Sequence, residues 1–129
     1  MVDPSTVRGV RRIMRSVRLS YAGLRYAVKH DVAIREELIA LAVLVPLSTL
    51  LPVTDVEHLL LVLSMMLVIL VEFINSAIES TIDRISPEQH PVSGRAKDLA
   101  NIAVVIAVLM MGLCWVVIAG PVFLQWVGT

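Results

Sequence analysis

Five polar side chains follow one face of a helix that begins inside a membrane-length apolar segment. The apolar segment runs from Leu59 to Val71, and the polar stripe that follows consists of Glu72, Asn75, Ser76, Glu79 and Asp83. Spacings of three and four residues place these groups on one side of an α-helix. A carboxylate near the middle of a bilayer costs about 2.5 kcal/mol or more, so an ionisable residue there indicates a functional site. Carboxylates beside an amide suit a Mg²⁺–phosphate site or acid–base chemistry.

The two glutamates of this polar stripe suit different roles. Glu72 lies deepest in the apolar segment, and a water-poor setting tunes carboxylates toward the proton affinity that a general base needs. Glu79 lies two turns nearer the membrane surface, about 10 Å along the axis, where it could hold a hydrated Mg²⁺. Asn75 could orient either group. The alternative is a helix-packing cluster in which Asn75 and Ser76 join helices, but packing alone does not need two acids.

A turn-rich loop with basic ends, residues 84–98, follows the polar stripe. Lys97 could neutralise phosphate, and Arg95 could grip it with two parallel hydrogen bonds. Ser93 is placed to cap the next helix, whose N-terminus favours anions. The sequence contains neither a P-loop nor a dinucleotide-binding glycine pattern, so another form of phosphate binding is expected. The alternative is a solvated, capped turn whose cations only set orientation in the membrane.

A third charged segment lies just before the first apolar run. Asp31 could supply a second metal carboxylate if helix packing brings it near Glu79. Glu36 and Glu37 could meet polar groups of a nucleotide or a lipid. The alternative is an interfacial charge cluster whose long side chains reach toward water. His90 has no partner at a spacing that would form a zinc site, so zinc is not expected.

Composition indicates an all-α membrane protein. The chain has 129 residues, of which 57% are hydrophobic, and a mean hydropathy of +0.84. These values are too apolar for an ordinary soluble domain. Residues 5–30 carry basic and apolar side chains on opposite faces at helical spacing, which predicts an amphipathic helix lying on the membrane surface. The alternative is a basic arm that binds nucleic acid. The apolar runs that follow argue against it, and no nucleic-acid partner is expected.

Three spanning helices are expected within one membrane domain, residues 1–129. The predicted spans are 34–51, 57–83 and 99–119. Pro46 is expected to kink the first span. The second is longer than a bilayer requires, so its polar end projects into water. The third helix is expected to begin near Ser93, ahead of its span, and to end before Pro121.

The charges of the loops predict the orientation of the chain in the membrane. The segment from Pro52 to His58 contains no Lys or Arg, whereas the 84–98 loop contains Arg84, Arg95 and Lys97. The positive-inside rule therefore places the N-terminus and the 84–98 loop in the cytoplasm and the C-terminus outside. The unusual polar groups then all face the side where nucleotide is available.

These segments together resemble the small bacterial integral-membrane diacylglycerol kinase family. The similarity is most specific in Val71-Glu72-x-x-Asn75-Ser76-Ala77-Ile78-Glu79, Asp83-Arg84 and Ser93-Gly94-Arg95-Ala96-Lys97-Asp98, and it extends over nearly the whole chain. The resemblance implies a homotrimer in the bacterial inner (cytoplasmic) membrane, with active sites between subunits near the cytoplasmic surface. It also implies transfer of the γ-phosphoryl group of MgATP to diacylglycerol, which gives phosphatidic acid.

The resemblance further implies roles for individual residues. Glu72 matches the catalytic base, with Asn75 in support, and Asp31 and Glu79 match the residues that hold Mg²⁺. The positions that match nucleotide-binding residues are Arg12, Leu19, Asp31, Glu79, Glu88, Gln89, His90, Lys97 and Asp98. The positions that match the lipid-binding region are Arg12, Ser16, Val17, Arg18, Leu19, Ser20, Tyr21, Arg25, Ala33, Ile34, Arg35, Glu36, Glu37, Glu72, Asn101 and Trp115.

Three of these positions depart from the family pattern. Asp31 stands where the family has Glu, so its carboxylate is one methylene group shorter in reach. Glu36 stands where a Gln is expected and adds a negative charge near the nucleotide. Leu19 stands where a Tyr is expected and removes a ring. The departures bear on the affinity for metal and ATP, and they leave the class of reaction unchanged.

Two other functions remain open. A related enzyme phosphorylates undecaprenol, and Ser86-Pro87-Glu88-x-His90-Pro91 resembles that branch, whereas Ser93-Gly94-Arg95-Ala96 resembles the diacylglycerol branch. A non-enzymatic oligomeric membrane protein, such as a small cation channel, would also use an acidic stripe that faces a central axis. That function leaves the basic 84–98 loop and the basic surface helix unexplained.

Overall fold

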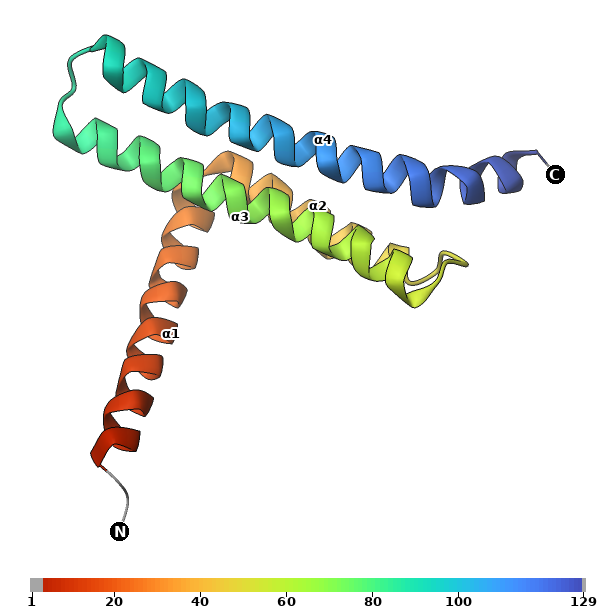
Figure 1. The fold of residues 1–129 in the computed structure, drawn as a ribbon, viewed down its shortest axis with the longest axis horizontal. Helices are drawn as coiled ribbons and strands as arrows, with labels where there is room; N and C mark the ends of the chain where they lie inside the picture. The colour runs from red at the N-terminus through yellow and green to blue at the C-terminus, as the bar shows by residue number, and fades with distance from the viewer. Residues whose placement is uncertain (1–3, 129) are drawn as a thin grey trace.

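Four α-helices make up the part of the chain that the computed structural model describes, residues 4–128. They are α1 (Pro4–His30), α2 (Val32–Ser48), α3 (Asp55–Ile85) and α4 (Pro91–Val127), and no strand occurs between residues 4 and 128. Residues 1–3 and 129, at the ends of the expected domain, lie outside this range. Figure 1 shows α2, α3 and α4 running side by side, while α1 projects away from them. The predicted all-α architecture is confirmed.

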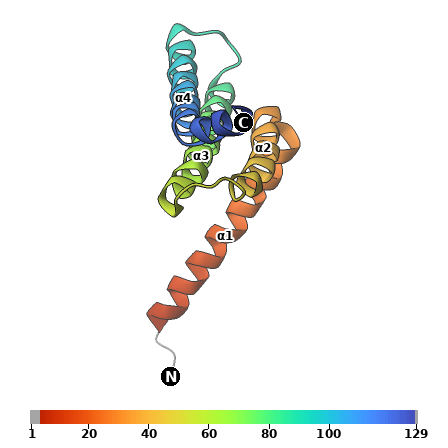
Figure 2. The ribbon, with the colours of Figure 1, turned by 90° about the vertical axis from the view of Figure 1, so that its right-hand side faces the viewer.

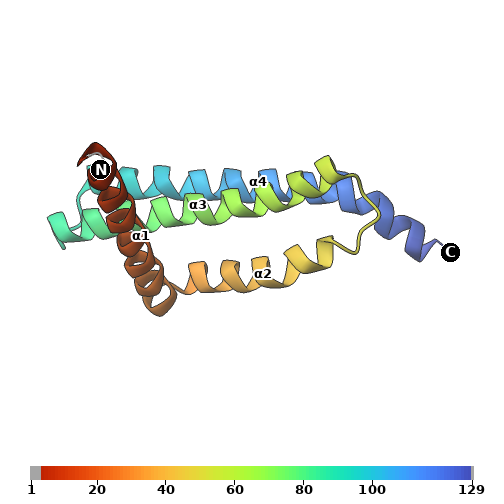
Figure 3. The ribbon, with the colours of Figure 1, turned by 90° about the horizontal axis from the view of Figure 1, so that it is seen from below.

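α1 stands apart from the other helices along most of its length. Among its described side chains, from Val7 to His30, only Ala27 is buried. Figure 2 shows that α1 meets the bundle only at its C-terminal end, beside α2. Figure 3 shows that the axis of α1 runs across the axes of α3 and α4. Met14 and Val17 are both more than three-fifths exposed. An exposed apolar face on a basic helix suits a helix that lies in the membrane surface.

Two of the three predicted spans are matched by helices long and apolar enough to cross a membrane, α3 and α4. α2 has 17 residues, about 25 Å at the rise of an α-helix, which is shorter than a hydrocarbon core of about 30 Å. The expected helix over residues 34–51 therefore ends three residues early, at Ser48. Pro46 lies in its last turn, where the hydroxyls of Ser48 and Thr49 bond to backbone carbonyls and close the helix.

The N-terminus of α3 is closed by a reciprocal pair of hydrogen bonds between Thr54 and Glu57. The Thr54 hydroxyl accepts a hydrogen bond from the backbone N–H of Glu57 at 3.2 Å, and the Glu57 carboxylate accepts one from the backbone N–H of Thr54 at 2.9 Å. This capping box satisfies two of the donors that a helix start leaves unpaired. The helix therefore includes Asp55 and extends two residues beyond each end of the predicted range 57–83.

α4 begins earlier than expected and is capped by a different residue. The sequence predicts a start near Ser93 with that serine as the cap. The helix instead starts at Pro91, and His90 Nδ1 accepts a hydrogen bond from the backbone N–H of Val92 at 3.2 Å. Proline suits the first position of a helix because its missing N–H would be unpaired there. The prediction for Ser93 is therefore wrong.

α4 also continues through Pro121, where the sequence predicts an end. Proline disfavours the helical conformation of the preceding residue by crowding its Cβ atom. That residue is Gly120, which has no Cβ, so this part of the clash is removed. The helix runs to Val127 and changes direction near this point, as Figures 1 and 3 show. The expected end of the third helix before Pro121 is therefore wrong.

α3 is the central helix of the bundle, since it packs against both α2 and α4. Its buried apolar side chains are Leu61, Met65 and Val68, at helical spacing. α4 buries the small residues Ala100 and Ala107. Small residues allow helices to approach closely where lipid gives no hydrophobic drive for association. This packing fixes the polar stripe relative to the other helices.

Truncation of Leu61 is expected to destabilise the bundle. Leu61 is fully buried, whereas the adjacent Leu60 is 46% exposed. Leu61→Ala should leave a cavity and lower the free energy of unfolding by about 2 kcal/mol or more. Leu60→Ala should cost much less because lipid or detergent fills the space. Unfolding of both variants in detergent measures the difference. If both lose the same free energy of unfolding, the face of α3 that carries Leu61 is not packed against other helices as described.

Candidate active site

The polar stripe of α3 passes from the buried middle of the helix to the open end of the bundle. Glu72 and Asn75 are each 7% exposed. Ser76 is half-buried, and Glu79 and Asp83 are exposed. Successive members of the stripe therefore meet increasingly water-rich surroundings toward the α3–α4 connection. A deep carboxylate and a shallow one on the same face can serve a lipid hydroxyl and a hydrated cation respectively.

Asp31 and Glu79 line the same pocket although they lie 48 positions apart in the sequence. This carboxylate pocket measures about 320 Å³ and has walls from the end of α1, the start of α2 and the outer half of α3. Tyr26 and His30 contribute stacked rings whose centroids are 4.2 Å apart. The structure thus brings together the two residues that the sequence predicts as metal ligands.

Asp31 is held by two hydrogen bonds in the short break between α1 and α2. Its Oδ1 atom accepts the backbone N–H of Ile34 at 3.2 Å and so caps α2. Its Oδ2 atom accepts the hydroxyl of Ser76, on α3, at 2.5 Å. Each carboxylate oxygen has a second acceptor site, so both remain able to meet a cation. The side chain therefore has a fixed orientation on the pocket wall.

Glu37 and Glu72 extend this acidic region into the helix packing. Both carboxyl groups lie near enough to Asp31, and to each other, to interact electrostatically. Glu37 Oε2 and Asn75 Oδ1 are buried without a hydrogen-bond partner among the described side chains. Buried polar atoms are normally paired, so each exception calls for an explanation such as an absent ligand.

The carboxylate pocket has the ligands that Mg²⁺ prefers. Mg²⁺ is usually held by one or two carboxylates together with water and substrate phosphate oxygens. Asp31 and Glu79 supply two carboxylates on one pocket. Among residues 4–128, no group of three or more His, Cys, Asp or Glu side chains lies in an arrangement that could hold a metal ion. The donor set therefore fits Mg²⁺ that arrives with a nucleotide.

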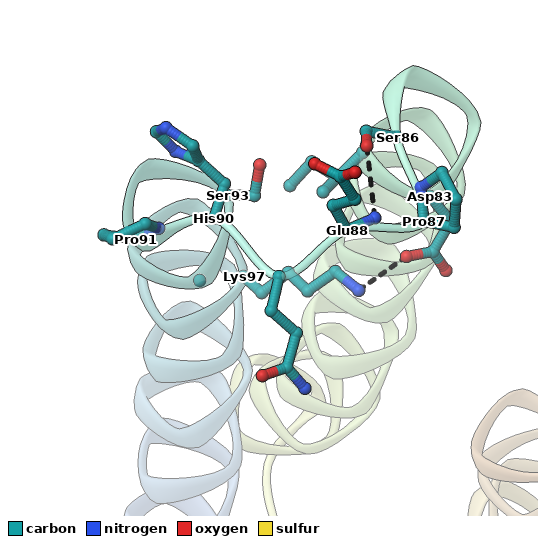
Figure 4. A pocket seen from close by; sticks show the side chains of 11 residues that line it. Asp83, Ser86, Pro87, Glu88, His90, Pro91, Ser93 and Lys97 are labelled. Atoms are coloured by element: carbon teal, nitrogen blue, oxygen red, sulfur yellow. Dashed lines mark hydrogen bonds and ion pairs between the residues drawn. The ribbon is translucent and has the colours of Figure 1, made fainter.

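A second pocket, of about 520 Å³, lies at the α3–α4 connection (Figure 4). This loop pocket is lined by three of the predicted nucleotide-binding loop residues, Glu88, Gln89 and His90, and by Lys97 from α4. Figure 4 shows Lys97 reaching across to Asp83 on α3. The connection itself is braced by the Ser86 hydroxyl, which accepts the backbone N–H of Glu88 at 3.1 Å.

Lys97 is the single Lys or Arg among the described residues that line the two pockets. Its Nζ atom lies 2.6 Å from the Asp83 carboxylate, and Asp83 lines the carboxylate pocket as well as the loop pocket. The hydrogen bond that it donates to Asp83 raises the pKa of Lys97, so the ammonium group is charged at neutral pH. Asp98, the next residue, is exposed and is not among the residues that line the loop pocket.

The predicted ligand residues of α1 are not part of the pocket walls. Arg12, Arg25 and the segment 16–21 are all exposed, and all but Arg25 lie on the part of the helix that projects from the bundle (Figures 1 and 2). None of them lines either pocket. Within one chain, these side chains therefore do not join Asp31, Glu72 and Glu79.

The predicted lipid-binding residues at the start of α2 have diverse surroundings. Ile34 is fully buried, and Ala33 is half-buried. Arg35 donates to the backbone carbonyls of Val28 and Lys29 at 3.3 Å each, and so binds the last turn of α1. Glu36 is exposed. Ile34 and Arg35 thus join α1 to α2 in addition to any contact with a lipid.

Asn101 and Trp115 are the predicted lipid-binding residues of α4. Asn101 is exposed, and Trp115 is half-buried. The indole Nε1 of Trp115 is buried without a hydrogen-bond partner among the described residues. A buried tryptophan N–H usually has a partner, so this donor is an exception among the described residues.

The sequence predicts neither the partner of Ser76 nor that of Asp83. The alternative in which Ser76 joins helices agrees with its hydrogen bond to Asp31. Both residues belong to the polar stripe. Their contacts join residues 45 and 14 positions apart. Helical periodicity reports which residues share a face and gives no information on contacts between helices. The signal that could have found them is the stripe itself, because Ser76 and Asp83 share the face of Glu79.

Comparison with known proteins places the chain in a family. A model of the prokaryotic diacylglycerol kinase family matches residues 18–119. The chain is 40% identical over 110 residues to a diacylglycerol kinase of Escherichia coli K12, covering 85% of this chain and 90% of that protein. It is 38% identical over 107 residues to a diacylglycerol kinase of Haemophilus influenzae, with 83% and 91% covered. The Pseudomonas aeruginosa diacylglycerol kinase is 36% identical over 110 residues, with 85% and 89% covered. This chain therefore belongs to the prokaryotic diacylglycerol kinase family of enzymes.

Proposed function

We propose that this chain is a lipid kinase that transfers the γ-phosphoryl group of MgATP to the hydroxyl of 1,2-diacylglycerol, giving phosphatidic acid and ADP. One observation carries the proposal. Asp31, at the start of α2, and Glu79, on α3, line a single pocket beside the half-buried Glu37 and the buried Glu72. A phosphoryl-transfer site needs such a carboxylate pair for the nucleotide's metal and a separate group for the acceptor hydroxyl. The relatives named as diacylglycerol kinases support the choice of acceptor.

Nucleotide binding is assigned to the two pockets together. Asp31 and Glu79 would hold the Mg²⁺ that comes with ATP, and the bound ion would neutralise charge on the phosphate chain. Lys97 would add positive charge at the border of the two pockets, next to Asp83. The loop residues Glu88, Gln89 and His90 line the pocket beyond. Release of Lys97 from Asp83 toward a phosphate exchanges one charge-assisted hydrogen bond for another.

Activation of the lipid is assigned to Glu72. Its carboxylate would accept the proton of the lipid hydroxyl as that oxygen attacks the γ-phosphorus. Asn75, one turn away and with an unpaired Oδ1, would accept a hydrogen bond from the hydroxyl or from a water beside it. The lipid's chains would remain in the bilayer while its polar end reaches the buried part of the polar stripe.

We also propose that the active unit is a homotrimer of three-span subunits in the bacterial inner membrane. α2 would form the third span by tilting little and by local thinning of the bilayer. Arg12 does not reach the site within one chain, so a neighbouring subunit's α1 would bring it there. The N-terminus and both pockets would face the cytoplasm, and the C-terminus the outside.

Removal of the charge of Lys97 is expected to weaken nucleotide binding. A charge-assisted hydrogen bond contributes about 1.5–3 kcal/mol, so Lys97→Gln should raise the KM for ATP about tenfold or more. Lys97→Arg keeps the charge and should retain most of the affinity. Steady-state kinetics in mixed micelles at varied ATP would measure the effect, and an unchanged KM in Lys97→Gln would remove Lys97 from the nucleotide site.

The decisive test of the proposed function offers two lipids in parallel. Purified protein in mixed micelles would receive labelled ATP with either diacylglycerol or undecaprenol, and Glu72→Gln would be the control. Labelled phosphatidic acid that depends on Glu72 is the expected result. Labelling of undecaprenol alone would assign the chain to the alternative substrate that the segment 86–91 resembles. Labelling of neither lipid, together with ion flux in proteoliposomes, would overturn the kinase proposal.

A further inference from the structure

We infer that Ser76 is a positioning residue for the metal site, because its hydroxyl holds the Asp31 carboxylate on the pocket wall that Glu79 also lines. The inference rests on the proposed function, since it takes Asp31 and Glu79 as the metal ligands. It assigns Ser76 a role that requires no contact of its own with nucleotide or lipid. Ser76 would act only through Asp31.

The position of Ser76 on α3 supports this role. Ser76 and Glu79 are three residues apart, which places them one above the other on the same face of the helix. Both line the carboxylate pocket, as does Asp31. A hydrogen bond from Ser76 to Asp31 therefore fixes the Asp31 carboxylate about one helical turn from Glu79. The bond ties Asp31, at the start of α2, to α3, which carries Glu79. It therefore fixes the position of one carboxylate relative to the other, which the geometry of a single helix cannot do.

The two contacts of Asp31 have separate effects. The bond from the backbone of Ile34 fixes Oδ1, but a carboxylate held at one oxygen can still turn about its last torsion. The bond from Ser76 fixes Oδ2 as well. Together they define the plane of the carboxylate before any ligand binds. Hydrogen bonds of this kind to metal-binding carboxylates orient the ligands.

A hydroxyl is the partner that keeps Asp31 available to a cation. A serine O–H donates one hydrogen bond and leaves the negative charge in place, whereas Lys or Arg would neutralise it. The single ion pair within the described part of the chain joins Lys97 to Asp83, so Asp31 has no such competitor there. Ser76 thus restricts the motion of the carboxylate without reducing its charge.

The test measures metal binding directly, separately from turnover. Free Mn²⁺ would be followed by electron paramagnetic resonance in solutions of the full chain in detergent with a non-hydrolysable ATP analogue. Ser76→Ala should weaken Mn²⁺ binding about tenfold, the lower end of the effect of losing an outer-shell partner. Ser76→Thr, which keeps the hydroxyl, should restore most of the affinity. Thr81→Ala removes a hydroxyl that bonds only within α3, to the carbonyl of Ala77, and should leave Mn²⁺ binding unchanged.

A further variant separates positioning from a purely structural tie. In Asp31→Asn the amide oxygen can accept from Ile34 and the amide NH2 can donate to the Ser76 hydroxyl, so both contacts remain while the charge is lost. This variant should keep the wild-type Tm and bind Mn²⁺ more weakly than Ser76→Ala. If Ser76→Ala lowers the Tm while its Mn²⁺ affinity equals that of wild type, the hydroxyl only ties helices together and the inference is wrong. If wild-type protein itself binds no Mn²⁺ with the analogue, the proposed kinase site fails along with it.

Discussion

Glu72→Gln is expected to bind MgATP as wild type does and to lose nearly all phosphoryl transfer to lipid. The amide has the shape of the carboxyl group, so the 7% exposed side chain keeps its packing. It cannot accept the proton of the lipid hydroxyl. A positioned general base contributes about 10²–10⁴-fold to a rate, and the loss in kcat should fall in that range. The KM for ATP should change little, because the nucleotide is assigned to Asp31, Glu79 and the loop pocket.

Initial rates in mixed micelles and nucleotide binding measured on the same preparation would separate these two effects. Asp55→Asn is the matched control, since Asp55 is an exposed acid in the first turn of the same helix, at its far end. Turnover of Glu72→Gln comparable to that of the control would sink the assignment of the base. Loss of nucleotide binding as well would instead place Glu72 in the metal site.

Glu79→Gln should raise the Mg²⁺ concentration needed for half-maximal activity. An amide oxygen binds Mg²⁺ far less well than a carboxylate. Loss of an outer-shell partner already weakens metal affinity about 10-fold or more, so loss of a direct ligand should shift the Mg²⁺ titration by at least that much. Glu79 is exposed, so the substitution should not destabilise the bundle.

The Mg²⁺ titration would be run at fixed ATP, with Asp55→Asn again as the control and thermal unfolding as a check on the fold. At saturating Mg²⁺ the kcat of Glu79→Gln should recover in part, which distinguishes it from Glu72→Gln. A Mg²⁺ titration that coincides with that of wild type would argue that Glu79 is not a ligand and leave Asp31 without its proposed partner.

Much of the fold follows from hydrophobic pattern and capping chemistry. The amphipathic pattern of residues 5–30 predicts α1, and the apolar runs predict α3 and α4, because long periodic segments dominate local preferences. The boundaries near Pro46, Pro91 and Pro121 were less predictable. Pro91 begins a helix, Pro46 lies in the last turn of one, and Pro121 lies inside one after Gly120. Which of these effects a proline has depends on the neighbouring side chains and on its depth in the membrane.

The candidate site likewise has a part that the sequence predicts and a part that it does not. The chemical identity of the polar stripe and the depth of Glu72 follow from the sequence, since one helix carries them. The meeting of Asp31 with Ser76 and Glu79 depends on the break at residue 31, which turns the chain from α1 into α2. No local pattern encodes the angle of that turn. Arg12 lines neither pocket within one chain, and its predicted contribution likewise cannot be placed from local patterns.

The passage of α4 through Pro121 carries information about membrane depth. Proline has no N–H, so the carbonyl of Val117 loses its usual helical partner. An unpaired carbonyl costs several kcal/mol in hydrocarbon but little in the hydrated headgroup zone. The helix from Leu99 to Ala119 is about 30 Å long, which equals the thickness of the hydrocarbon layer. We therefore expect α4 to leave the hydrocarbon layer at Gly120 and Pro121. A spin label moved along α4 should become accessible to water there.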